Sequence, residues 1–435
     1  MERRAQPRQS RTRVGRRRAG RARHGVPGLN PLLLLWLVPL VWALLLLVYA
    51  KRLAALWHEP VWRVPVLVVE SDDWGAGPLE QAAALTAIHA VLLRHRDATG
   101  QPAKMTLGVI LAVVDTATTT ASAYQRVVFD DARLAPVLDA LRGGIAAGVF
   151  VPQLHGMEHY WPPAVLAAAQ TDSVVAAWLT GAAWPATEAL PSALQSRWTD
   201  ARVLPSLSLP VAEIDVAAAL ETATFARIFG QAARVAVPTT FVWNDAVERA
   251  WAAHGVRYIV TPGTRHTGRD AAGKPIGDGR VIRNGERSHS GVRYPNGERR
   301  NSGIRYLVRD QYFEPALGHD AARGLAALAR QTLLGRPALL ETHRFNFIGT
   351  AAAASLQTLD VMLTEARGAY PGLRFMSTEQ IAEAMLQTDT ALLETGLRWR
   401  LRAGLTRSHT LPRFARLARL SGLALPLWIM QQLSA

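Results

Sequence analysis

From about residue 60 onward, short apolar runs alternate with longer segments rich in alanine and leucine. The apolar runs at 64–70, 105–115 and 149–156 have the length of buried strands, and the segments 79–95 and 131–148 between them have helical composition. Such alternation predicts βα units around a parallel sheet or barrel, so the fold class is α/β. In such folds, ligand-binding groups lie at the carboxyl ends of the strands.

The segment 31–50 is a different pattern, because it contains twenty residues without a charge. Twenty helical residues span about 30 Å, the thickness of a hydrocarbon core, so we predict a transmembrane anchor. A buried core helix and a cleaved signal peptide are the alternatives. Residues 1–30 hold ten arginines, against Lys51 and Arg52 directly after the segment. This asymmetry predicts a cytoplasmic head and an extracytoplasmic domain, attached to the inner membrane by a single span.

The formal net charge of +15 is concentrated at the N-terminus. Residues 1–30 contain ten arginines and one acid, Glu2, which together account for nine of those charges. The chain carries no motif for DNA or RNA recognition, so we expect no nucleic-acid partner. It has no cysteine, which excludes disulfides and thiol chemistry.

Two further segments stand apart from the alternating pattern. The sequence NGERSHSGVRY (284–294) recurs as NGERRNSGIRY (296–306) and predicts a duplicated, basic hairpin insertion at 284–306. In the tail at 388–435, Phe414, Leu417 and Leu420 recur at helical spacing between arginines. Such a basic amphipathic segment can lie on an anionic membrane, and the alternative is a helix packed on the domain or on a partner.

Candidate chemistry begins at the end of the first strand. Asp72 and Asp73 are adjacent there, and His155 and His159, at the end of the predicted strand 149–156 and just after it, have metal-ligand spacing. Two adjacent carboxylates are costly to bury unless a cation relieves their repulsion. One Asp with two His would hold a divalent metal and leave open positions, with the other Asp free as a base. Helix capping or a turn is the alternative for the Asp pair.

A third candidate is His343, which follows the short apolar run 338–340. A histidine at a late strand end is placed to act as a general acid. The alternative is a structural histidine.

Taken together, these motifs resemble the polysaccharide deacetylases of carbohydrate esterase family 4, which contain a NodB-homology domain. The residues that carry the resemblance are Glu70-Ser71-Asp72-Asp73-Trp74-Gly75, the histidines of His155-Gly156-Met157-Glu158-His159, and Leu340 to His343, in the order the family has them. The resemblance covers about 64–387 and implies a distorted (β/α) barrel.

The resemblance also implies roles for individual residues. Asp72 would be the catalytic base and His343 the catalytic acid, while Asp73, His155 and His159 would bind the metal, with Zn²⁺ the expected ion. The resemblance and the sequence around these motifs suggest contacts with substrate for the following residues: Trp74, Thr240, Phe241, Arg344 and Asn346. The chain departs from the family where Trp74 precedes Gly75 and where Gly156 replaces a hydroxyl residue. No arginine stands where the family has one to tune the base.

We therefore expect a membrane-anchored, metal-dependent hydrolase at 64–387, which removes N-acetyl groups from an envelope or secreted polysaccharide. Its substrate would be a carbohydrate, in one version a lipid-linked one. A deformylase or O-acetyl esterase on the same scaffold is one alternative. A non-catalytic carbohydrate-binding scaffold protein is the other.

Overall fold

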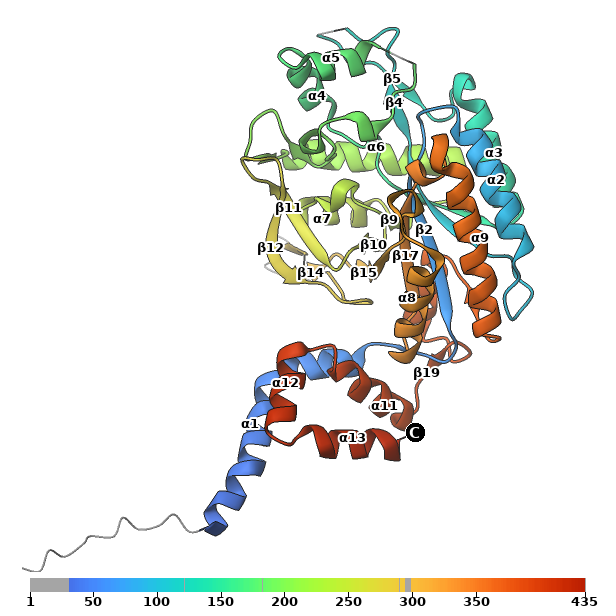
Figure 1. Cartoon of the computed structure of the whole chain (residues 1–435). Coiled ribbons are helices and arrows are strands. Elements are labelled where there is room, and N and C mark those ends of the chain that lie inside the picture. Colours follow the sequence, from blue (N-terminus) through green and yellow to red (C-terminus); the bar gives the residue numbers. More distant parts are fainter. Residues whose placement is uncertain (1–30, 121, 182, 289, 294–298, 435) are drawn as a thin grey trace, which may run out of the picture.

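The computed structural model describes residues 31–434 apart from 121, 182, 289 and 294–298. The predicted basic head at 1–30 lies outside the described residues. The fold is mixed α/β, with a curled parallel sheet and helices around it, as the alternating pattern predicts (Figure 1).

The sheet is built around the ten-residue strand β2, Val66–Gly75, which is buried along its whole length. Its strands follow the order β15-β10-β9-β6-β3-β2-β17-β16, and β18 also pairs with β2. Every pairing in this sheet is parallel. The bounds of the other strands are β3 Met105–Ile110, β6 Phe150–Leu154, β9 Val235–Ala236, β10 Tyr258–Thr261, β15 Arg305–Val308, β16 Gln311–Tyr312, β17 Ala338–His343 and β18 Arg374–Phe375.

The two edge strands of this sheet are consecutive in the chain. β15 pairs with β10, β16 pairs with β17, and only Arg309 and Asp310 separate them. Arg309 N–H donates to the Thr261 carbonyl (2.9 Å) and Asp310 N–H to the Leu339 carbonyl (3.1 Å). One extended segment therefore joins the two edges and completes a distorted barrel.

Side chains of β2 alternate between two apolar clusters, as a strand with both faces buried requires. Leu67 and Val69 belong to the larger cluster, which includes residues of the helices α2 (Gln81–Arg94) and α9 (Ala352–Ala369). Val66 and Val68 belong to a second cluster, formed with alternate residues of β9, β10, β15 and β17 and with residues of α10. By the same alternation Glu70 and Asp72 point with Val66 and Val68 toward the inside of the barrel.

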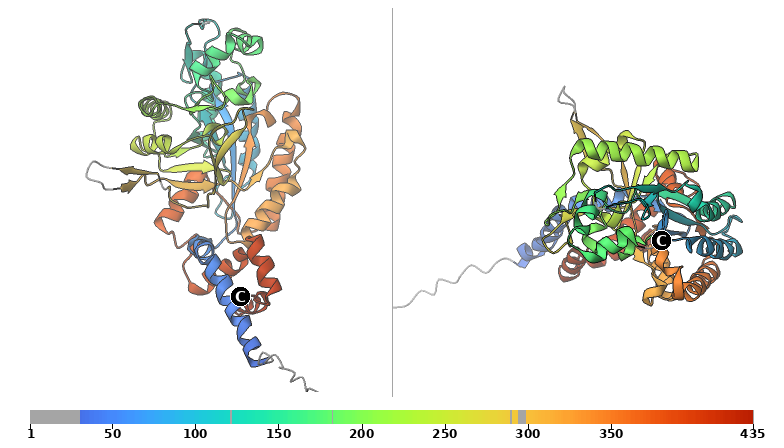
Figure 2. Two further views of the ribbon diagram at one scale, coloured as in Figure 1. Left: turned by 90° about the vertical axis from the view of Figure 1, so that its left-hand side faces the viewer. Right: turned by 90° about the horizontal axis from the view of Figure 1, so that it is seen from above.

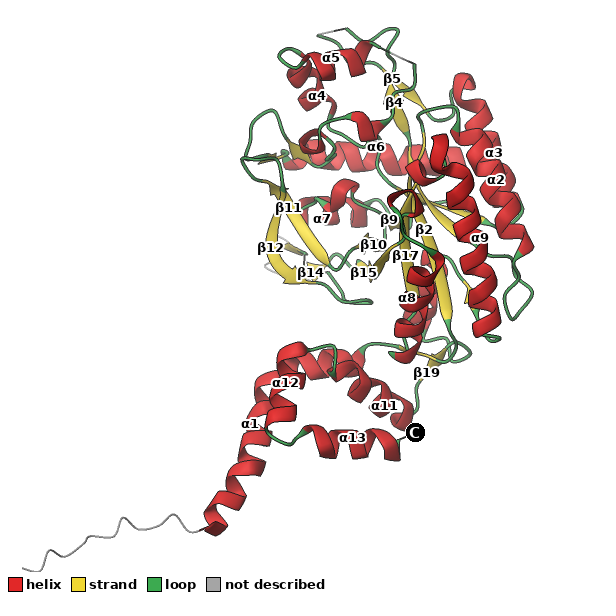
Figure 3. Ribbon diagram, in the orientation of Figure 1, coloured by secondary structure: helices red, strands yellow, loops and turns green. Residues whose placement is uncertain are grey.

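Helices surround the sheet (Figure 3). Polar caps begin several of them: Asn244 caps α7, Asp320 caps α8, and Ser377 with Gln380 forms a capping box on α10. The helices of the barrel region are α2 Gln81–Arg94, α3 Ala135–Ala146, α4 Pro162–Ala169, α5 Ser173–Thr180, α6 Val211–Phe229, α7 Asp245–Ala253, α8 Ala321–Leu333, α9 Ala352–Ala369 and α10 Thr378–Gln387.

Short strand pairs decorate the barrel. The predicted hairpin insertion contains an antiparallel pair, β13 with β14. The remaining strands are β1 Val61–Trp62, β4 Ala112–Val114, β5 Arg126–Val128, β7 Thr199–Asp200, β8 Leu207–Ser208, β11 Thr264–Arg269, β12 Pro275–Val281, β13 Gly291–Arg293, β14 Arg299–Asn301 and β19 Leu393–Glu394.

Four helices form a separate group at one end of the barrel (Figures 1 and 2). They are α1 Pro31–His58, α11 Leu397–Ser408, α12 Pro412–Leu420 and α13 Ala424–Leu433. The segment Trp36–His58 of α1 is long and apolar enough to cross a membrane. In its most apolar stretch of 18 residues, only 11% is buried against the rest of the protein. Helix α1 continues past Lys51 and Arg52, so it is longer than the predicted 31–50. The structure also shows three tail helices where the sequence indicated one amphipathic segment.

Candidate active site

A bulge near the end of β2 explains how two adjacent aspartates can face the same pocket. Consecutive residues of a regular strand point to opposite faces. Between Ser71 and Trp74 the register of β2 against β3 shifts, and Asp73 has a left-handed backbone with a φ of 71°. This bulge re-aims Asp73, so Asp72 and Asp73 line the same pocket.

Asp73 lies between two histidines. Its Oδ1 atom is 3.3 Å from Nε2 of His155 and 3.3 Å from Nε2 of His159. His155 directly follows β6, and the turn after it brings His159 back to the same point. One ligand atom from each of the three side chains lies within 4.8 Å of the others, and all three residues are buried. The structure thus brings together the predicted Asp-His-His group.

The donor set of this group fits a divalent cation. His155 Nδ1 lies 2.9 Å from the Val237 carbonyl, so Nδ1 carries a proton and Nε2 is the nitrogen that faces Asp73. Asp73 Oδ1 is buried without a hydrogen-bond donor among the described residues. Burial raises the pKa of Asp73, but His159 and His155 outweigh it and hold that pKa below its usual value. An ionised carboxylate and imidazole nitrogens are suitable ligands for zinc.

Asp72 has a different partner, Arg309. Nη1 and Nη2 of Arg309 donate to Asp72 Oδ2 (2.5 Å) and Oδ1 (2.9 Å), and Nε of Arg309 donates to Glu70 Oε2 (2.5 Å). Burial would raise the pKa of Asp72, but Arg309 and His155 lower it below its usual value. Asp72 is therefore held ionised.

His343 is bound to Glu314. Its Nδ1–H donates to Glu314 Oε1 (2.6 Å), while the Asn346 side chain donates to Glu314 Oε2. Burial alone would lower the pKa of His343, but Glu314 and the two aspartates raise it to about 10. The imidazole is therefore protonated at neutral pH. His343 pairs with Asp72 in the register of β17 on β2, so acid and base candidates are neighbours.

A second group of possible ligands, Asp72, Glu341 and His343, overlaps the first. Nη1 of Arg309 lies 2.5 Å from Asp72 and 3.4 Å from Glu341. A guanidinium in this position already neutralises these carboxylates, which disfavours a cation there. The Asp73 group is the better metal centre.

The pocket that contains these residues has a volume of about 420 Å³. Thr240 and Phe241 line it, and both have left-handed backbones, with φ of 50° and 55°. Phe241 N–H donates to the Pro238 carbonyl (2.9 Å), whereas the Thr240 N–H has no hydrogen-bond acceptor among the described residues. Other lining residues that sequence reasoning did not single out include Tyr312, Glu314, His319, Arg323 and Phe345.

Three residues expected to contact substrate are buried elsewhere. Trp74 is fully buried, donates from its indole to Ser71 Oγ (2.8 Å) and stacks with Phe347. Arg344 is buried and pairs with Glu188 (2.6 Å), and Asn346 is buried against Glu314. None of the three lines the pocket. We therefore propose packing or positioning roles for them in place of substrate contacts.

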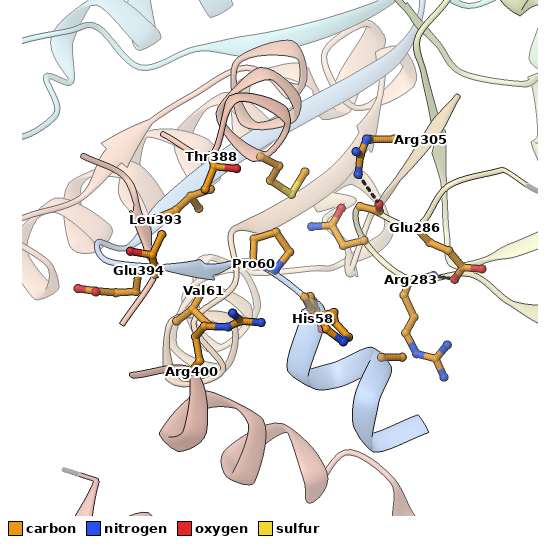
Figure 4. Close-up of a pocket in the computed structure, with 16 residues that line it drawn as sticks. His58, Pro60, Val61, Arg283, Glu286, Arg305, Thr388, Leu393, Glu394 and Arg400 are labelled. Carbon is orange, nitrogen blue, oxygen red and sulfur yellow. Dashed lines mark hydrogen bonds between the residues drawn. The ribbon is translucent and has the colours of Figure 1, made fainter. Parts of the chain in front are cut away.

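A larger cavity, of about 550 Å³, lies near the other end of the barrel (Figure 4). His58 is its one histidine. Two of its carboxylates already have arginine partners, Glu59 with Arg336 (2.7 Å) and Glu394 with Arg63 (3.3 Å). It lacks the clustered titratable groups of the smaller pocket, so we place the candidate site in the smaller one.

Sequence reasoning missed Arg309 and Glu314. Each follows a strand of the sheet: Arg309 comes directly after β15, and Glu314 comes two residues after β16. A charged residue at or near the end of an apolar run was the sequence signal that could have identified both residues. The predicted repeat insertion at 284–306 overlaps the beginning of β15 and obscured this signal.

No protein-family model matches the chain, and no curated protein matches it. Among solved structures, the chain is similar to a 4-alpha-glucanotransferase from Thermococcus litoralis, at 11% identity and a TM-score of 0.38, covering 75% of this chain and 41% of that one. It is also similar to the Xyl-CE4 domain of a multidomain xylanase from the hindgut metagenome of Trinervitermes trinervoides, at 9% identity, a TM-score of 0.34 and 74% and 91% coverage.

A family 4 carbohydrate esterase from Streptomyces lividans, solved in complex with acetate, is similar at 10% identity and a TM-score of 0.31, over 72% of this chain and 91% of that one. Members of the family that the motifs resemble are thus among the similar solved structures.

Proposed function

We propose that the chain is a metal-dependent hydrolase that removes acetyl groups from the amide nitrogens of a carbohydrate. The observation that supports this proposal is that Asp72, Asp73, His155, His159 and His343 all line one pocket. The three groups differ in their partners. Asp73 lies between two histidines, Asp72 is paired with Arg309, and His343 is hydrogen-bonded to Glu314. A pair of groups whose pKa values are pushed apart is typical of acid–base catalysis.

Asp73, His155 and His159 would hold the metal, and we propose zinc because the donors are two imidazoles and a carboxylate. When bound, such a cation polarises a carbonyl and makes water a better nucleophile at neutral pH. Asp72, the neighbour of Asp73, is ionised and lines the pocket. It accepts the proton that water loses as the new C–O bond forms.

His343 supplies the second proton transfer. An amine leaves an sp³ carbon poorly unless its nitrogen is protonated. Protonated His343, bound to Glu314 through Nδ1, presents Nε2–H to that nitrogen as the C–N bond breaks. Water and amide are thereby converted to a carboxylic acid and an amine, with both protons accounted for.

We propose that the N–H of Thr240 stabilises the oxyanion. Thr240 lines the pocket, and its N–H has no acceptor among the described residues. One such donor contributes about 3 kcal/mol of transition-state stabilisation in other enzymes. Phe345 stacks on His343, with ring centroids 6.0 Å apart, and offers with Tyr312 a surface for a sugar ring.

The proposal is tested with purified full-length protein and a panel of hexosamine oligosaccharides in N-acetylated, N-formylated and O-acetylated forms. We expect release of acetate and new amines. Formate or acetate from O-acetyl esters alone would move the assignment to the deformylase or esterase alternative. Glycan binding without any product would favour the non-catalytic alternative.

Variants separate metal binding from proton transfer. Asp73→Ala and His155→Ala should lose the metal in elemental analysis, whereas His343→Ala should keep the metal and lose turnover. Full metal occupancy in both ligand variants would refute the ligand assignment.

We further propose that α1 anchors the protein in the inner membrane with the barrel on the extracytoplasmic side.

A further inference from the structure

The tail beyond the barrel has an unusual charge composition. Residues 396–435 contain seven arginines and no aspartate or glutamate. Arg413, Arg416 and Arg419 are exposed on α12. The barrel offers these three no carboxylate partner among the described residues.

Helix α13 adds an apolar surface to this charge. Its ten residues carry no charge and none of them is buried. Leu425 is 63% exposed, Trp428 56% and Leu433 77%, so the helix presents large apolar side chains to its surroundings. A soluble surface rarely gathers such residues on one element.

Helices α11 and α12 pack on α1, where the candidate membrane span lies, whereas α13 begins beside α1 and runs away from it (Figure 1). Tyr49 contacts Phe414 of α12, with ring centroids 5.3 Å apart. Nearer the start of α1, Trp42 donates from Nε1 to the carbonyl of Ser421 (2.8 Å), the residue that follows α12. The beginning of α13 therefore lies at the level of the middle of α1.

Helix length then decides what surrounds α13. From Pro31 to Trp42, α1 has twelve residues, which span about 18 Å and are too short for a hydrocarbon core of about 30 Å. A bilayer crossed by α1 must therefore extend past Trp42, to the level of Ser421 and α13.

We infer that α11, α12 and α13 form a membrane-docking unit with α1 in an anionic phospholipid bilayer. The apolar side chains of α13 lie in the acyl region, at the depth of the middle of α1, and the arginines of α12, which packs beside Tyr49 near the end of the uncharged segment, extend toward the lipid phosphates. The occupant is anionic because the unit carries only positive charge. The face is continuous with α1, which makes lipid the medium that covers it.

This docking sets the direction of the candidate site. Helix α1 leads into β1 and the beginning of β2, whereas Asp72 lies seven residues along β2, about 20 Å farther up the barrel. The pocket therefore opens at the end of the barrel away from the bilayer. If the proposed function holds, the substrate is therefore a glycan that extends away from the membrane surface. An acetyl group on a lipid headgroup, close to the bilayer, would not reach the pocket.

The chain has no cysteine, so a single introduced cysteine can carry an environment-sensitive fluorophore. Trp428→Cys places the label on α13, and Val216→Cys, at a residue 70% exposed on α6, is the matched control on the barrel. Both full-length proteins are reconstituted in phosphatidylcholine vesicles with and without phosphatidylglycerol. We expect a blue-shifted emission at 428 that lipid-borne nitroxides quench, and neither effect at 216.

Emission at 428 that matches position 216 would overturn the inference. A blue shift that lipid nitroxides do not quench would also overturn it, because it would show a second protein copy on this face. The triple variant Arg413→Gln, Arg416→Gln, Arg419→Gln tests the charge. It should reduce quenching at 428 in anionic vesicles to the level in phosphatidylcholine alone, and equal quenching in both lipids for the parent would contradict the anionic assignment. Acetate release by the labelled proteins reports on the site separately, so the two proposals can fail independently.

Discussion

Arg309 and Asp72 form a buried ion pair with two hydrogen bonds, although 237 positions separate them in the sequence. Arg309 lies where the chain passes from one edge of the sheet to the other. The ring of Phe241 lies over its guanidinium, 5.7 Å from ring centroid to Cζ, and covers it on one side. The residue that completes the barrel is thus also the residue that fixes the charge of the proposed base.

Replacing Arg309 by lysine should raise the pKa of Asp72. A lysine ammonium is a point charge that cannot donate in parallel to Asp72 and Glu70, so the carboxylate is less stabilised. The base works only when ionised, so activity is lost as pH falls through its pKa. The acidic limb of the kcat/KM profile should therefore move to higher pH in the variant, with the metal content unchanged.

The matched control is Arg305→Lys, four residues earlier on the same strand segment, whose guanidinium donates to the Gly285 carbonyl (3.3 Å). Its acidic limb should stay in place. An unshifted profile in Arg309→Lys would show that Asp72 does not set that limb. Arg309→Met should also destabilise the protein by about 3–5 kcal/mol, because it leaves a buried carboxylate unpaired.

Glu314→Gln should lower the pKa of His343. Burial favours the neutral imidazole, and the bond to Glu314 is among the interactions that oppose it and raise the pKa to about 10. An acid must be protonated to work, so activity is lost as pH rises through its pKa. The alkaline limb of kcat/KM should therefore move to lower pH, and NMR titration of His343 should show the same shift.

Glu188→Gln is the control, because Glu188 lines the same pocket but pairs with Arg344. It should leave the alkaline limb where it is. If both variants shift that limb equally, the effect comes from the general field of the pocket and His343 has no special dependence on Glu314.

The sequence was sufficient for the groups that follow single strands. Asp72, Asp73, His155, His159 and His343 could be singled out because each lies within about five residues after an apolar run, and parallel strands bring such ends together. The barrel could be predicted in class for the same reason. None of this needed knowledge of which strands are neighbours.

The partners of these groups needed that knowledge. Arg309 reaches Asp72 only because β15 and β16 join the two edges of the sheet. Glu314 reaches His343 because β16 pairs with β17. Trp74 resembled a substrate contact by position, but the bulge at Asp73 changes which face each residue presents. Such effects depend on register, which local pattern does not specify.

Removal of the metal should destabilise the protein. A ligand that binds only the folded state stabilises it by about 4 kcal/mol at a thousandfold excess over its dissociation constant, which raises Tm by on the order of 10 °C. Dialysis against a chelator should lower Tm, and added Zn²⁺ should restore it.

His159→Ala should abolish this response to chelator and zinc. His254→Ala should retain it, because His254 lies outside the candidate site, 3.5 Å from Asp215. A wild-type Tm that ignores both treatments would be evidence against a resident metal.

Gly108→Ala tests the position of the Asp72 carboxylate directly. A Cβ atom at Gly108 would lie 2.3 Å from Asp72 Oδ1, and 3.1 Å from its Cγ, so the carboxylate must leave Arg309. A misplacement of about 1 Å can cost on the order of 100-fold in rate. We therefore expect a loss of at least that size, measured as acetate release, with the metal retained because Asp73 is not displaced.

Gly143→Ala provides the comparison, since a Cβ atom at that helical position meets no atom within 4 Å. Alanine is a better helix former than glycine, so this variant should gain up to about 1 kcal/mol in stability and keep full activity. Wild-type turnover in Gly108→Ala would mean that a displaced carboxylate still supports the reaction. Asp72 could then not be the base, because proton transfer from water requires it within hydrogen-bond reach.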